Sequence, residues 1–205
     1  ADRDVIGFSK DGGTFAFEEY GTQDGSGFPY ANIYVIDTGS DDWVSGTPIK
    51  VRRDNEEAAL KTVRAEARAK AKAILTKRKV TEPGIILVSN PVTELSADPY
   101  KVQFRTNPYL GADDLKLTLT LTPLPLEATK ACAPYGDASG FRLTLASLNG
   151  ASRVLHEDKT IPASRGCALG YAIADVISLD EGSSFATLAI LVSVFTQGFE
   201  GPDRR

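Results

Sequence analysis

The residue types that the sequence lacks, or has few of, exclude several kinds of site and protein. Its 205 residues include no methionine, one histidine, one tryptophan and two cysteines. A single histidine excludes metal centres built from several histidines. The longest apolar run, Phe185 to Phe195, is shorter than the roughly 18 residues that a membrane-spanning helix needs, so no transmembrane segment is expected. The 42% of hydrophobic and 24% of charged residues exclude a largely disordered chain, and the length predicts one domain over residues 1–205.

The two cysteines and the start of the chain bear on its location. Cys132 and Cys167 lack the C-x-x-C spacing of redox and zinc motifs, and they would form a disulfide in an oxidising compartment. The alternative is two unrelated buried thiols in a cytosolic protein. The opening Ala1-Asp2-Arg3-Asp4 is typical of a chain from which a signal peptide has been removed. We therefore expect a periplasmic or secreted protein with a disulfide.

Charge is unevenly distributed along the chain. Residues 1–49 carry nine acidic and two basic residues, for a net charge of −7, whereas residues 50–79 carry eleven basic and four acidic residues, for +7. The whole chain has a net charge of −4. A concentrated basic block is either a solvated helix face or an electrostatic contact surface.

The basic block also contains the strongest helical pattern, which predicts a helix inserted at about residues 54–79. Asp54 or Asn55 can cap its start, and Pro83-Gly84 prevents its continuation. A stripe of apolar side chains would dock it, and alanines would occupy the opposite side. Between these two sides lies a row of cations, which we call the basic flank: Lys61, Arg64, Arg68, Lys72 and Lys79.

Most of the remaining sequence is typical of β-strands. Leu115 to Thr122 alternates leucine with polar residues, Pro123 and Pro125 are expected to end that strand, and Asn149-Gly150 predicts a hairpin turn. About ten strands are expected, which predicts a mainly β fold with one long inserted helix (α+β), arranged as an antiparallel β-sandwich or a barrel-like sheet. The other predicted strands are Thr14–Glu19, Asn32–Asp37, Ile85–Ser89, Tyr100–Arg105, Phe141–Leu145, Arg153–His156, Ala168–Ile177 and Phe185–Phe195.

No motif in the sequence identifies a catalytic centre, a metal site or a cofactor. His156 precedes Glu157 and Asp158, so a histidine–carboxylate pair is conceivable, but no G-x-S-x-G motif supplies a nucleophile. A hydrogen-bonded structural histidine is the simpler interpretation. The acidic loops at residues 11–13 and 37–42 lack the spacing of a calcium-binding loop and are typical of turns.

Four cations are candidates for contact with a partner. Arg64, Arg68 and Lys72 belong to the basic flank, which suits a protein, an anionic polysaccharide or a lipid headgroup. Arg165 lies next to Cys167 and suits carboxylate recognition, although a surface arginine is the simpler interpretation. No aromatic residue accompanies the basic flank, which disfavours nucleic acid. Alternatively, the acidic segment 1–49 neutralises the basic flank internally.

Two stretches of the sequence resemble known families. Phe8-Ser9-Lys10-Asp11-Gly12-Gly13-Thr14-Phe15-Ala16-Phe17, followed by Ile33 to Asp37, resembles one blade of TolB-like propellers, which implies a meander but not a propeller because the pattern does not recur. Together with Ile161 to Cys167 and the ending Gly198 to Arg205, this stretch is similar to a bacterial family of predicted secreted proteins of unknown function. The resemblance implies secretion, and it supplies no established catalytic residues to transfer to this chain. In the ending we expect Phe199 to fill the core and Glu200 to pair locally.

These observations favour a non-enzymatic secreted or periplasmic domain that binds a protein or an anionic envelope component without a cofactor. The alternative is a hydrolase of an unfamiliar type that uses His156 with a neighbouring carboxylate.

Overall fold

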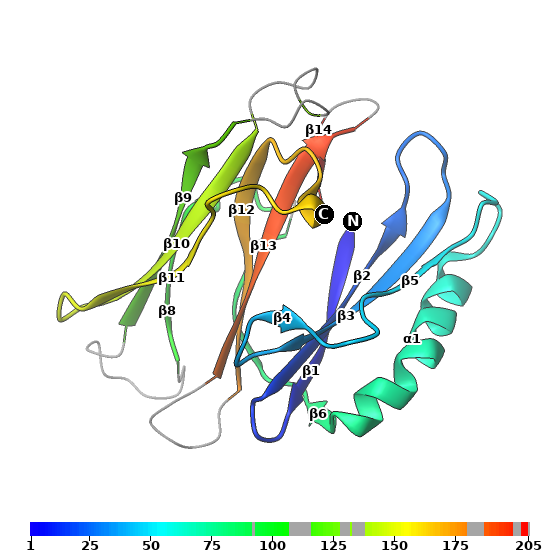
Figure 1. Cartoon of the computed structure of the whole chain (residues 1–205), viewed down its shortest axis with the longest axis horizontal. Coiled ribbons are helices and arrows are strands. Elements are labelled where there is room, and N and C mark those ends of the chain that lie inside the picture. Colours follow the sequence, from blue (N-terminus) through cyan, green and yellow to red (C-terminus); the bar gives the residue numbers. More distant parts are fainter. Residues whose placement is uncertain are drawn as a thin grey trace. The chain divides into compact units, whose positions relative to one another are not determined.

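A computed structural model of the chain describes residues 1–91, 93–106, 116–127, 132, 138–179, 187–198 and 202–204. The chain forms two compact units, Ala1–Gly84 and Ile85–Arg204 (Figure 1). The described elements are antiparallel strands, a single α-helix and one short 3-10 turn, which confirms the predicted mainly β fold. None of the sheets in the described part of the chain closes into a barrel. The organisation as one domain stays a prediction.

The first unit is a six-stranded sheet with the helix α1 on one face (Figure 1). Strands β1 to β4 follow one another across the sheet, as the blade-like sequence predicts, while β6 pairs with β1 and β5 pairs with β3. The predicted turn after Phe8-Ser9 is present, and Gly12 adopts the positive φ of 70° that the turn requires. The strands are β1 (Asp2–Ser9), β2 (Thr14–Thr22), β3 (Pro29–Asp37), β4 (Asp42–Trp43), β5 (Ile49–Arg52) and β6 (Val80–Glu82).

The helix is shorter at its start than the sequence predicts. It covers Leu60–Lys77, and the N-cap residue Ala59 makes no side-chain capping bond. The side chain of Asn55 instead accepts the backbone N–H of Glu57 at 3.0 Å, which closes a turn before the helix. The packing prediction is confirmed at its centre, because Val63, Ala67 and Ala71 are buried against the sheet.

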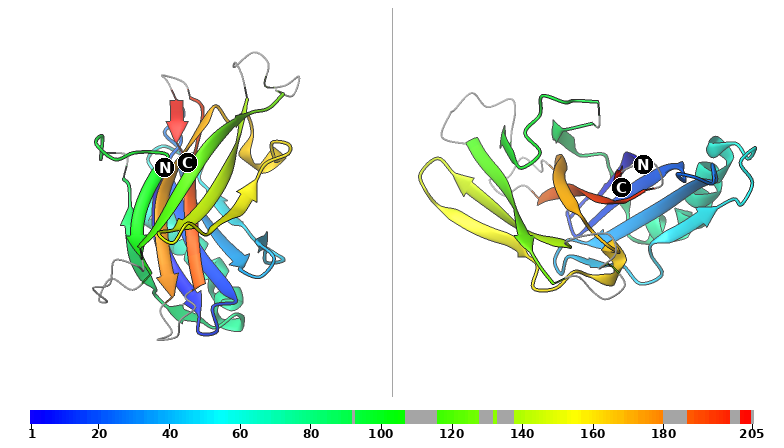
Figure 2. Two further views of the ribbon diagram at one scale, coloured as in Figure 1. Left: turned by 90° about the vertical axis from the view of Figure 1, so that its left-hand side faces the viewer. Right: turned by 90° about the horizontal axis from the view of Figure 1, so that it is seen from above.

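The second unit is a sandwich of two four-stranded sheets, which Figure 2 shows from two further sides. Both sheets contribute to one core, for instance through Leu119 and Phe141 from one sheet and Tyr171 and Ile173 from the other. The first sheet has the order β11-β10-β9-β8 and the second the order β14-β13-β12-β7. Their bounds are β7 (Ile85–Ser89), β8 (Lys101–Arg105), β9 (Lys116–Pro125), β10 (Ser139–Ser147), β11 (Ser152–Glu157), β12 (Gly170–Leu179), β13 (Thr187–Gln197) and β14 (Pro202–Arg204), with a 3-10 turn at Ala163–Arg165.

The predicted strands of this unit are found with shifted ends. Strand β9 runs through Pro123 to Pro125, so the prediction that these prolines end it is wrong. Its ladder with β10 continues to that point, with Pro125 opposite Ser139. Leu115, Phe199, Glu200 and Arg205 lie outside the described residues.

The expected disulfide is present in the second unit. Cys132 and Cys167 are bonded, with their Cα atoms 5.2 Å apart. The bond spans 35 residues of sequence and fixes the segment before β12. This confirms the pairing that the sequence predicts for an oxidising compartment.

Candidate functional site

The candidate site lies along one side of α1 in the first unit. The buried alanines and Val63 hold the helix on the sheet, so the neighbouring helical positions face outward along its flanks. The basic flank therefore extends along α1 beside the strands β1 and β6, whose residues Ile6, Val80 and Thr81 lie close to it.

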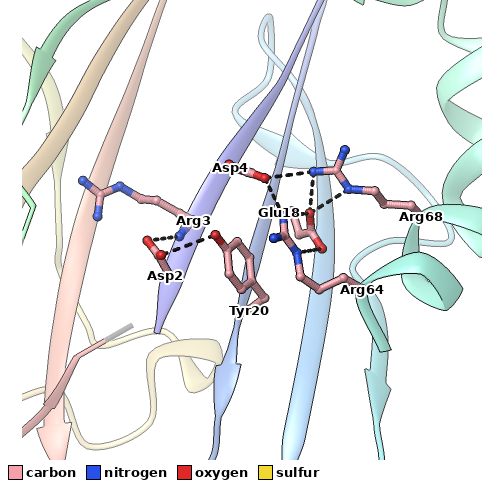
Figure 3. A network of polar contacts seen from close by, with 7 residues as sticks. All are labelled: Asp2, Arg3, Asp4, Glu18, Tyr20, Arg64 and Arg68. Carbon is pink, nitrogen blue, oxygen red and sulfur yellow. Dashed lines mark hydrogen bonds and ion pairs between the residues drawn. The ribbon is translucent and has the colours of Figure 1, made fainter. Parts of the chain in front are cut away.

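Two arginines of the basic flank bind a buried carboxylate (Figure 3). Glu18 on β2 has no exposed side-chain surface and accepts two bonds from Arg64, at 3.0 Å to Oε1 and 2.9 Å to Oε2. Arg68 Nε donates to Oε2 of the same carboxylate at 2.8 Å. Asp4 on β1 contacts both guanidinium groups, at 3.2 Å from Arg68. We call these four residues the Glu18 cluster.

Tyr20 extends the Glu18 cluster toward the start of the chain. The guanidinium of Arg64 lies 3.5 Å from the centre of the Tyr20 ring, in cation–π geometry. The Tyr20 hydroxyl donates to Asp2 at 3.3 Å. Burial, together with the charge of Asp2, raises the pKa of Tyr20.

The electrostatics of the Glu18 cluster favour its charged form. Burial alone would raise the pKa of Glu18, but the hydrogen bonds and positive charges of Arg64 and Arg68 outweigh that effect and hold the pKa below its ordinary value. The bond to Glu18 in turn raises the pKa of Arg64. Two cations thus face two anions, and the cluster contributes no net charge to the surface of α1.

The lysines of the basic flank, unlike its two arginines, form no ion pairs with described residues. Lys61, Lys72 and Lys79 are exposed. None of them forms an ion pair with a residue that the structure describes. The internal neutralisation that the sequence offered as an alternative therefore applies to the two arginines. It reaches Lys79 only as a long-range effect, because the charge of Lys79 is the smallest of the causes that lower the pKa of Asp11.

Two adjoining hollows lie along this side of α1, and we call them together the α1 groove. The larger has a volume of about 630 Å³ and is lined by Lys72, Lys79 and apolar side chains that include Leu75. The smaller, of about 430 Å³, lies nearer the start of the helix and is lined by residues that include Leu60 and Lys61. Both hollows share Ala65 and Arg68 and are open to solvent. The α1 groove thus combines an apolar lining with three exposed lysines that form no ion pair with a described residue.

A second polar cluster lies in the sandwich. Asp158 is almost fully buried and accepts bonds from Arg165 at 2.5 Å and from the backbone N–H of Phe141 at 2.9 Å. His156 Nε2 lies 2.8 Å from the other oxygen of Asp158 and 3.3 Å from Arg165 Nη2. The Arg165 guanidinium also lies over the ring of Phe141, 4.7 Å from its centre.

The Asp158 carboxylate is held in its charged form. Burial would raise the pKa of Asp158, but the bonds from Arg165, His156 and the Phe141 N–H lower it below its ordinary value. Arg165 is mostly buried, and the carboxylate that it binds, Asp158, belongs to its own chain. Its role in binding a partner stays a prediction.

The acidic loops form turns in the structure. Asp11 Oδ1 accepts the Ser9 hydroxyl at 2.6 Å and the Gly13 N–H at 3.1 Å, and Asp37 Oδ1 accepts the Gly39 N–H at 3.1 Å. Within the described ranges, no three histidine, cysteine or carboxylate side chains are grouped closely enough to hold a metal ion.

Sequence reasoning identified the basic flank, Arg165 and His156 with its neighbouring carboxylates, but it missed Glu18 as the anion that binds the basic flank. Glu18 alternates with Ala16 and Tyr20 along β2, so it occupies a position that faces the helix. A charged residue at an inward position of a strand is a signal of a buried ion pair. Its partners, however, come from α1, more than 40 residues further along the chain.

The architecture defines a β-rich protein with a disulfide-bonded sandwich and a helix-covered sheet. Residues 16–205 match the model of the family described as "Predicted secreted protein (DUF2259)", and the chain belongs to this family. This agrees with the periplasmic or secreted location expected from the sequence. No curated protein and no solved structure matches the chain significantly. Among the helices that the structure describes, none has the length and apolar character needed to cross a membrane.

Proposed function

We propose that this secreted protein is a non-enzymatic binding domain that contacts an anionic partner through the α1 groove. The partner is a periplasmic or extracellular protein or an anionic component of the cell envelope. The observation that carries this proposal is the presence of Lys61, Lys72 and Lys79 beside an apolar hollow, with no carboxylate of the described chain paired to them. Arg64 and Arg68 shape the groove while bound to Glu18.

A polyanion column tests the proposal. The chain has a net charge of −4, so retention on dextran sulfate at low salt requires a local basic surface. We expect the wild-type protein to be retained and the triple variant Lys61→Glu/Lys72→Glu/Lys79→Glu to flow through. Phosphatidylglycerol vesicles serve as a second anionic probe in a sedimentation assay.

The control changes the net charge equally at exposed lysines away from the groove. The variant Lys10→Glu/Lys50→Glu/Lys101→Glu should keep most of the retention, because these residues line neither hollow. Equal loss in both variants would show that overall charge decides retention, and the α1 groove would then lose its assigned role. Absence of wild-type binding to both probes would contradict the proposal as a whole.

The hydrolase alternative has one supporting observation, the 2.8 Å contact between His156 Nε2 and Asp158. This is the neighbouring carboxylate that the alternative requires. The same nitrogen, however, also faces Arg165, and no hydroxyl or thiol of the described chain is hydrogen-bonded to His156. A His156→Ala variant would lose any hydrolytic activity found on ester or glycoside test substrates if the alternative is correct. Retained activity would remove it.

A further inference from the structure

We infer that the partner of the α1 groove is a protein that presents an acidic amphipathic helix. This inference rests on the proposed function and names the class of partner. It follows from the spacing of the lysines, the lining of the groove and its open form, which are independent properties of the same surface.

The lysines are spaced at whole turns of a helix. Lys61 and Lys72 are 11 residues apart, which is about three turns or roughly 16 Å along α1. Lys79 follows seven residues later, just after the last turn of α1. A second helix lying beside α1 has the same rise per residue, so acidic side chains 11 residues apart would meet Lys61 and Lys72. Lys79 has a φ of 54° and lies past the helix end, where an acidic side chain about seven residues further along the partner would be near it.

The lining between the lysines suits the apolar face of such a helix. Ala65 and Ala69 are exposed and small, so a partner backbone can approach α1 closely. Ile6, Leu75 and Val80 line the larger hollow, where apolar side chains spaced three or four residues apart on one face of the partner would enter. The acidic and apolar positions of the partner thus occupy one side of one helix.

Other anionic partners leave part of this surface unexplained. A lipid surface is typically bound by four to eight clustered cations, whereas here Lys61 and Lys72 alone are roughly 16 Å apart and Lys79 lies beyond the end of α1, along two hollows. A charged polysaccharide would use the lysines but not the apolar lining. A protein helix uses both, which is why we favour it.

A selection from displayed peptides tests the inference even though the partner is unidentified. A library of random 18-residue peptides is selected against the intact, disulfide-bonded protein. We expect enrichment of amphipathic sequences with acidic residues 7 or 11 positions apart and apolar residues on the same face. Circular dichroism of a selected peptide should show helix formation on binding. Enriched peptides without this pattern, or no enrichment, would overturn the inference.

Two matched pairs of variants locate the binding site of a selected peptide. Ala69→Trp fills the larger hollow, whereas Ala73→Trp adds the same side chain at an exposed position of α1 that lines neither hollow. We expect the first to weaken binding at least tenfold and the second to leave it within twofold. Lys72→Glu should likewise weaken binding and Lys77→Glu should not, because Lys77 lies outside the groove.

The two proposals fail in different ways. If dextran sulfate or anionic vesicles bind through the three lysines but no helical peptide does, the anionic-partner proposal stands and the helix inference is wrong. If selected peptides bind Ala69→Trp as tightly as the wild type, the helix does not occupy the α1 groove. If neither the anionic probes nor peptides bind, both proposals are wrong.

Discussion

At the scale of single residues, buried carboxylates hold each unit together. Glu18 connects β2 to two turns of α1, and Asp158 connects the end of β11 to β10 and to the 3-10 turn that contains Arg165. Each carboxylate accepts bonds from several donors at once, which compensates for the loss of water around it. Removing one negative charge therefore leaves cations or N–H groups without their partner.

The variant Glu18→Gln tests whether the buried negative charge stabilises the Glu18 cluster. The amide removes the negative charge that Arg64 and Arg68 share and turns an N–H group toward them. Both arginines keep some solvent exposure, so we expect a loss of about 1–3 kcal/mol in the free energy of unfolding, measured with urea. The control Glu57→Gln, at an exposed position, should change it by less than about 0.5 kcal/mol. Equal effects would show that Glu18 has no special role.

The same cluster predicts a pH dependence. The pKa of Glu18 is lower in the folded protein than its ordinary value of 4.5, so its contribution to stability is complete above that value and is lost as the pH falls through the folded pKa. Between pH 6 and pH 3, roughly, the wild type should therefore lose more stability than Glu18→Gln does. Urea unfolding across this range measures the difference. Parallel curves for the two proteins would contradict the assignment.

The Asp158 site predicts a strict requirement for glycine at position 140. A Cβ atom there would lie 2.5 Å from Leu126 Cδ1 and 2.9 Å from Asp158 Cβ. The leucine methyl can rotate away, but Asp158 is held by Phe141 and Arg165. We expect Gly140→Ala to destabilise the protein by about 1–3 kcal/mol in urea unfolding. Gly39→Ala, in an exposed turn, is the control, and a loss as large at that site would show that the close contacts at Gly140 do not account for the effect.

These residue-scale features show where sequence reasoning ends. The pattern of β2 is readable, and a glutamate at an inward position indicates a buried pair. The pattern cannot show that Arg64 and Arg68 are the partners, because that depends on where α1 docks. Asp158 was visible beside His156, but Arg165 reaches it only through the fold of the segment between them.

At the scale of elements, α1 depends on small side chains at its contact with the sheet. Ala67 and Ala71 are fully buried there, while Ala73 is exposed on the other side. The apolar stripe was predictable from a period of 3.6 residues, and so was the row of exposed alanines. The start of the helix was not predictable, because the side chain of Asn55 closes a turn before the helix and Asp54 accepts a bond from Arg52.

Two leucine substitutions separate packing from helix propensity. Ala71→Leu places three extra carbons between α1 and the sheet, and we expect it to destabilise the protein by about 1–3 kcal/mol. Ala73→Leu has the same helix propensity change at an exposed position and should alter stability by less than about 0.5 kcal/mol. Thermal unfolding followed by circular dichroism compares them. If Ala71→Leu proved neutral, the contact between α1 and the sheet would be looser than the structure indicates.

At the scale of the whole molecule, the two units carry different probes. The first unit contains the only tryptophan, Trp43 on β4, and the second contains both cysteines. The sequence shows no shift in composition near Gly84, where the structure divides the chain, so it predicts one domain. Periodicity identifies strands one at a time, but the boundary depends on which strands pair, as when β7 joins β12 rather than the neighbouring β6.

Removing the disulfide tests the prediction that residues 1–205 form a single domain. The double variant Cys132→Ser/Cys167→Ser opens a loop of 35 residues, and the chain-entropy model predicts a loss of about 4 kcal/mol in the second unit. Trp43 fluorescence reports unfolding of the first unit only. If residues 1–205 unfold as one cooperative domain, as we expect from the sequence, the urea midpoint seen by Trp43 falls together with that seen by circular dichroism. A fluorescence midpoint that stays at its wild-type value, while circular dichroism shows an earlier transition, would mean that the first unit unfolds on its own and that the single-domain prediction is wrong.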